Sequence, residues 1–95
     1  MTIPMDNVQR LRLLCDLMQE DGFCLEATQI RNWIDSLSHL ALTAIDTMPL
    51  SQIHGLGIRM VASMCTADSQ LAVRQSIDTV LREFEKDNLN IHAIA

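Results

Sequence analysis

The stretch from Ile30 to Met48 constrains the fold more than any other part of this 95-residue sequence. Apolar side chains return there every three or four positions, at Ile30, Trp33, Ile34, Leu37, Leu40, Ala41, Ala44, Ile45 and Met48. That period matches one broad side of an α-helix, because a half-buried strand would alternate every second residue. Pro49 lacks an amide hydrogen and disfavours helix at the residue before it. We therefore predict one long central helix that begins between Leu25 and Thr28 and ends at Met48.

Some of these apolar residues form a continuous seam along the predicted helix, and the others lie beside that seam. The helix can therefore pack against two neighbours at once. The seam alternates steps of four and three residues, as in a coiled coil, and Ala41 and Ala44 are small enough for close helix approach. A two-fold homodimer is the commonest assembly of soluble chains. We expect a helical homodimer, with a dimer or partner interface that includes Ile30, Trp33, Ile34, Leu37, Ala41, Ala44 and Met48.

The composition favours an all-α fold. Hydrophobic residues make up 48% of the chain but aromatic residues only 3%, so Leu, Ile, Val, Met and Ala must build the core. Such a core suits packed helices, and three Gly and two Pro leave little turn chemistry for many strands. A chain of this length supports one core. We predict a single all-α domain over residues 1–95, a small bundle of three to four helices.

The N-terminal part is predicted to contain a short lead-in and one helix. Residues 1–5 form the lead-in, with Pro4 in an extended entry. Asp6 is placed as the N-cap of a helix that continues to about Glu20. Gly22 stands where a left-handed stop after that helix belongs.

The C-terminal half is predicted to add two helices and a tail. Residues 50–65 favour a helix weakened by two glycines, and the alternative is a turn around 54–57 followed by a shorter helix. Residues 66–69 cap a last, charged helix. Residues 89–95 form an apolar tail that docks either on its own core or on a second chain. Its anchors for a partner would be Leu89, Ile91 and Ile94.

The net charge of −5 argues against nucleic acid and anionic lipid as partners, because both repel an acidic surface. A helix-turn-helix protein remains a hypothesis, since residues 50–77 hold two helical segments joined by a short turn. The second helix carries residue types that can read bases: Ser69, Gln70, Arg74 and Gln75. Acidic residues surround that helix, which counts against this hypothesis.

The side chains that could bind metal or act as nucleophiles are Cys15, Cys24, Cys65, His39, His54 and His92. Their spacing contains no C-x-x-C, H-x-x-H or H-E-x-x-H pattern. Nothing in the sequence brings a cysteine beside a histidine, as nucleophilic catalysis would require. We therefore expect no metal, no cofactor and no enzymatic activity.

The odd number of cysteines and the absence of a secretory pattern at the start of the sequence indicate reduced thiols in the cytoplasm. Charged residues interrupt the longest apolar stretch, so we expect no membrane span. Together these features predict a small, acidic, non-catalytic regulator or inhibitor that binds another protein through its helices. A chaperone or adaptor for a secreted or assembling partner is the alternative within the same class.

Overall fold

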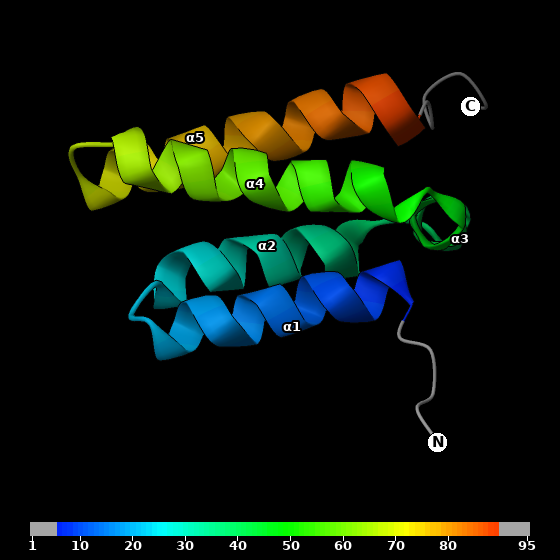
Figure 1. The fold of residues 1–95 in the computed structure, drawn as a ribbon, viewed down its shortest axis with the longest axis horizontal. Helices are drawn as coiled ribbons and strands as arrows, with labels where there is room; N and C mark the ends of the chain where they lie inside the picture. Colours follow the sequence, from blue (N-terminus) through cyan, green and yellow to red (C-terminus); the bar gives the residue numbers. More distant parts are fainter. Residues whose placement is uncertain (1–5, 90–95) are drawn as a thin grey trace.

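A computed structural model describes residues 6–89, which form five α-helices and no strand (Figure 1). The helices are α1 (Asn7–Glu20), α2 (Cys24–Ser36), α3 (His39–Thr47), α4 (Leu50–Thr66) and α5 (Gln70–Phe84). A five-residue π-helical turn, Glu85–Leu89, follows α5. The prediction of an all-α fold is confirmed. The prediction of three to four helices is too low.

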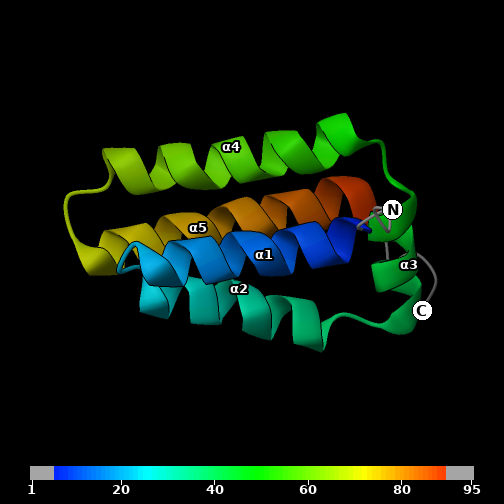
Figure 2. The same cartoon turned by 60° about the horizontal axis from the view of Figure 1, so that its bottom comes forward.

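The helices form two antiparallel hairpins joined by the short helix α3 (Figures 1 and 2). One hairpin consists of α1 and α2, and the other of α4 and α5. Helix α3 lies across one end of the bundle, so the chain leaves α2 and enters α4 at the same end. As a result α1 and α4 both begin at the α3 end and run in the same direction. These two helices carry the surface described below.

The predicted long central helix is wrong, because the chain breaks between α2 and α3. Leu37 and Ser38 are both extended, with ψ of 143° and 161°. The Ser38 hydroxyl accepts a hydrogen bond from the amide of Ala41 at 3.1 Å, which starts α3 as an N-cap. Apolar periodicity continues through the break because α2 and α3 bury residues in the same core. The period alone therefore could not reveal the turn.

Most of the predicted helix ends are confirmed. The Asp6 carboxylate caps α1 by accepting from the Gln9 amide at 2.7 Å, and Ser69 caps α5 in the same way. Gly22 has φ of +95°. The amide of Phe23 donates to the Met18 carbonyl, and that of Gly22 to the Gln19 carbonyl, the bonding pattern of a Schellman stop.

The segment that the two glycines made uncertain is helical. Residues 50–66 form α4, the longest helix in the described chain, and Pro49 separates it from α3 as predicted. An exposed ion pair lies on α5, with 2.9 Å between Arg82 Nη2 and Asp78 Oδ2. The turn around residues 54–57 is excluded.

Every helix contributes to one core. Its largest fully buried apolar side chains are Leu11, Ile30, Ile34, Ile45, Leu56, Met60, Ile77 and Leu81. Buried Asn7 fixes the start of α1 to the end of α3, where its amide Nδ2 donates to the carbonyls of Ile45 at 2.7 Å and Met48 at 3.1 Å. The backbone amide of Val8 donates to Asp46 Oδ1 at 3.0 Å. In residues 6–89 no helix is long and apolar enough to cross a membrane.

Candidate protein-binding groove

Exposed apolar side chains gather on α1 and α4. Eight large hydrophobic residues are exposed in the described part of the chain, and five of them belong to these two helices. The five are Leu13, Leu17, Leu50, Ile58 and Val61, each between 44% and 57% exposed. Single exposed Leu residues are ordinary, but a contiguous apolar patch on a small protein marks an interaction surface.

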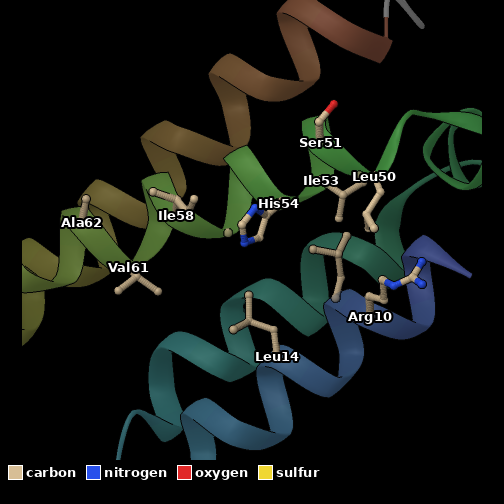
Figure 3. Close-up of a pocket in the computed structure, with 11 residues that line it drawn as sticks. Arg10, Leu14, Leu50, Ser51, Ile53, His54, Ile58, Val61 and Ala62 are labelled. Atoms are coloured by element: carbon tan, nitrogen blue, oxygen red, sulfur yellow. The ribbon is translucent and has the colours of Figure 1, made fainter. Parts of the chain in front are cut away.

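A groove of about 900 Å³ runs between these two helices (Figure 3). Its lining residues come from α1 and α4 alone: Arg10, Leu11, Leu14, Leu50, Ser51, Ile53, His54, Gly57, Ile58, Val61 and Ala62. Leu14 of α1 faces His54 and Val61 of α4 across the opening. The volume lies in the range of natural ligand pockets, and the groove is partly open to solvent.

The groove forms because one face of α4 packs into the core of the bundle, while the adjacent face of the same helix stays uncovered. Ile53, Leu56 and Met60 are buried at intervals of three and four residues. Residues 50, 54, 57, 58 and 61 lie on the adjacent side of the helix. Gly57 faces α1, since a Cβ added there would be in ordinary van der Waals contact with Leu14, 3.9 Å from its Cδ2.

Charge is sparse along the groove. Arg10 is the one Arg, Lys, Asp or Glu among the lining residues. Helix α4 contains no Asp or Glu, and its Arg59 pairs with Glu83 of α5. The other arginines of the α1–α2 hairpin pair with carboxylates between these two helices, Arg12 with Asp35 at 3.0 Å and Arg31 with Asp16. Arg10 has no such ion pair among residues 6–89.

The structure places the interface residues predicted from sequence mainly in the core of a single chain. Ile30, Ile34 and Ala41 are at most 1% exposed, and Leu89 is 7% exposed. Four others are partly buried against the core: Trp33, Leu37, Ala44 and Met48. Ile91 and Ile94 lie outside the described residues. The fully covered side chains have no surface to offer a partner, so we move the proposed interface to α1 and α4.

Trp33 joins α2 to the end of α5. Its ring lies edge-on to that of Phe84, with 6.1 Å between the ring centroids and 75° between the planes. Its indole Nε1 donates to Glu85 Oε2 at 3.1 Å. A half-buried Trp with a satisfied N–H is an ordinary core-edge anchor. Its predicted role at a partner interface therefore has no support in its contacts.

Helices α4 and α5 do not have the geometry of a helix-turn-helix. They run antiparallel side by side (Figures 1 and 2), whereas the two helices of that motif meet at about 90–120°. Of the residues proposed to read bases, Ser69 is used as the cap of α5. Arg74 is half-buried, and its Nε is shielded from solvent.

The three thiols differ in their exposure to solvent. Cys15 is buried in the core, and burial raises the pKa of its thiol although Arg31 nearby lowers it in part. Cys24 and Cys65 are exposed. No group of three His, Cys, Asp or Glu side chains in residues 6–89 is arranged to hold a metal ion.

The sequence contained a partial signal for the groove. Leu13 and Leu17 widen the apolar side of α1 beyond what one neighbour can cover, and Leu50 and Val61 extend the apolar content of α4. What no pattern supplied was the relative position of these helices, which are separated in the chain by α2 and α3.

Comparison with protein-family models, with curated proteins and with solved structures gave no match for this chain. No relative therefore assigns a function to any residue. The groove, its lining and the charges around it are the observations from which function is argued.

Proposed function

We propose that this chain is a non-catalytic, protein-binding regulator whose contact surface is the α1/α4 groove. The observation that carries this proposal is the exposed apolar surface of α1 and α4: Leu50, Ile58 and Val61 line the groove, and Leu13 and Leu17 are exposed on α1. Burial of one such side chain against a partner contributes about 1.5–3 kcal/mol relative to full exposure. Side chains that are already half-covered contribute less.

An amphipathic helix is the partner element that best fits the shape. The groove is apolar and lies between two helices, and an amphipathic helix that lays its apolar face into a hydrophobic groove is an established mode of recognition. A bound helix would place apolar residues at i, i+3, i+4 and i+7 against Leu14, Ile58 and Val61. The one charged lining residue, Arg10, would favour a carboxylate at that end of the partner helix.

Site-specific photo-crosslinking tests this proposal. A photoreactive phenylalanine analogue at Ile58 is expected to crosslink a second, different polypeptide in the cells that make this protein. The same analogue at Leu71, an equally exposed side chain on α5, is the matched control, since both positions are 57% exposed. The crosslink from position 58 should disappear when Val61→Glu places a charge in the groove.

Two results would overturn the proposal. One is an equal crosslinking yield from positions 58 and 71, which would indicate random encounters in place of docking at a specific surface. The other is a groove-specific crosslink that survives Val61→Glu, because an apolar helix could not remain against a buried, unpaired carboxylate. Circular dichroism of each variant shows whether its helices are intact.

A further inference from the structure

We infer that a second copy of this chain docks on the α1/α4 face, with the two α1 helices antiparallel across a two-fold axis. This inference rests on one part of the proposed function, namely that the α1/α4 surface is a protein-contact surface, and it names one occupant of that surface. Four residues carry it: Arg10, Leu14 and Leu17 of α1, and Asp21, the C-cap residue at the end of this helix. They form one stripe along the helix, at steps of four, three and four residues, which we call the α1 stripe.

The α1 stripe complements itself when it is reversed. Arg10 and Asp21 lie equally far from the point midway between Leu14 and Leu17. In an antiparallel pair, Arg10 therefore meets the partner's Asp21, and Leu14 meets the partner's Leu17. Each of these contacts occurs twice, as a two-fold interface requires. The result is a central apolar contact between two opposite-charge pairs.

The charges at the two ends of the stripe are available for such pairing. Neither Arg10 nor Asp21 forms an ion pair within residues 6–89. The nearest polar contact of Arg10 is a long one, 3.4 Å from Nη1 to Asn7 Oδ1 in the same helix. Arg12, two residues along, is already paired with Asp35. On α1, Arg12 and Asp16 are thus paired with α2, whereas Arg10 and the C-cap Asp21 have no ion pair within residues 6–89.

Helix α4 has the register that this arrangement needs. It runs in the same direction as α1, and Gly57 lies opposite Leu14, 3.9 Å from its Cδ2 when a Cβ is added. Ile58 is therefore level with the centre of the α1 stripe. A two-fold axis through that centre brings the two copies of Ile58, each 57% exposed, toward one another. Val61 and Leu50 would flank that contact.

Charge exchange tests the inference through light scattering and sedimentation. The wild-type chain is expected to have a dimeric mass. Arg10→Asp alone and Asp21→Arg alone should each weaken the dimer about tenfold or more, because each substitution creates two like-charge contacts. The double variant with both substitutions restores opposite charges in reversed order, so its dimer should recover to within about threefold of wild type.

These substitutions separate dissociation from unfolding. An acidic residue near the start of α1 and a basic residue at its end both have the sign that the helix dipole favours, and circular dichroism shows whether the helices of each variant are intact. Leu17→Glu should give a monomer with intact helicity. Leu71→Glu, a matched change outside the face, should leave the dimer unchanged.

The outcomes distinguish the inference from the proposed function. A monomeric wild-type chain at about 100 µM, or a double variant as weak as the single ones, would overturn the second-copy inference. A crosslink from position 58 to a different polypeptide would then leave the groove function standing. Conversely, a rescued dimer without any such crosslink would support self-association and overturn binding of another protein.

Discussion

Asn7 is a buried amide whose hydrogen bonds replace those that the end of α3 cannot make within its own helix. It is 4% exposed and donates to the carbonyls of Ile45 and Met48. We expect Asn7→Ala to lower the free energy of unfolding by about 1–3 kcal/mol, since it leaves two carbonyls without their donor. Urea denaturation measures this loss. Gln9→Ala, an exposed change two residues away, should alter the free energy by less than about 0.5 kcal/mol.

Glu26 is the opposite case, a buried polar group without a partner. Its side chain is 0% exposed, and neither carboxylate oxygen accepts a hydrogen bond from the described residues. We expect Glu26→Met to raise the free energy of unfolding by about 1–3 kcal/mol, because the apolar side chain has no desolvation penalty. Glu20→Met on the exposed side of α1 is the control. A destabilised Glu26→Met would show that the carboxylate has a stabilising partner.

Cys15 is the buried thiol among three cysteines, since Cys24 and Cys65 are exposed. Its burial removes access, and the raised pKa of its thiol lowers the thiolate fraction that reacts with alkylating agents. In native protein at pH 8, iodoacetamide should modify Cys24 and Cys65 at least about tenfold faster than Cys15. Peptide mass spectrometry follows each site. Equal rates in native and urea-unfolded protein would contradict a buried Cys15.

At the scale of single elements, local chemistry decided which predictions succeeded. Asp6, Gly22 and Pro49 each act through their own backbone or side chain, so their positions could be predicted without knowing the rest of the fold. The break at Leu37–Ser38 was missed because it keeps the apolar period intact. Its signal was the N-cap Ser38, a residue type that is common both at caps and elsewhere.

The glycines of this chain offer a matched test of element stability. Gly55 lies inside α4 with no atom within 4 Å of an added Cβ, whereas Gly22 has φ of +95°. We expect Gly55→Ala to raise the free energy of unfolding by about 0.5–1 kcal/mol, because alanine favours the helix interior. Gly22→Ala should lower it by about 1 kcal/mol or more, since alanine is strained at positive φ. Thermal denaturation of both variants compares them directly; a stabilised Gly22→Ala would contradict the left-handed stop.

At the scale of the whole molecule, the strongest apolar stripe in the sequence proved to be core. Ile30, Ile34 and Ala41 are buried against other residues of the same chain. Their regular spacing therefore reflects packing in the core of one chain. The surface left over is less regular, because it is shared between α1 and α4. A sequence pattern reports the apolar face of one helix, whereas a groove depends on how two helices are placed. That placement was not predictable here.

A face that binds a second copy links stability to concentration. If dimerisation covers Leu17 and Ile58, mass action favours the folded dimer as the protein concentration rises. We expect the thermal midpoint to increase by several degrees between about 1 and 100 µM. Arg10→Asp should remove most of this increase while leaving the midpoint at low concentration near that of wild type. Leu71→Glu should retain the increase. A midpoint that is constant over this range would show that the α1/α4 face does not bury itself against its own copy.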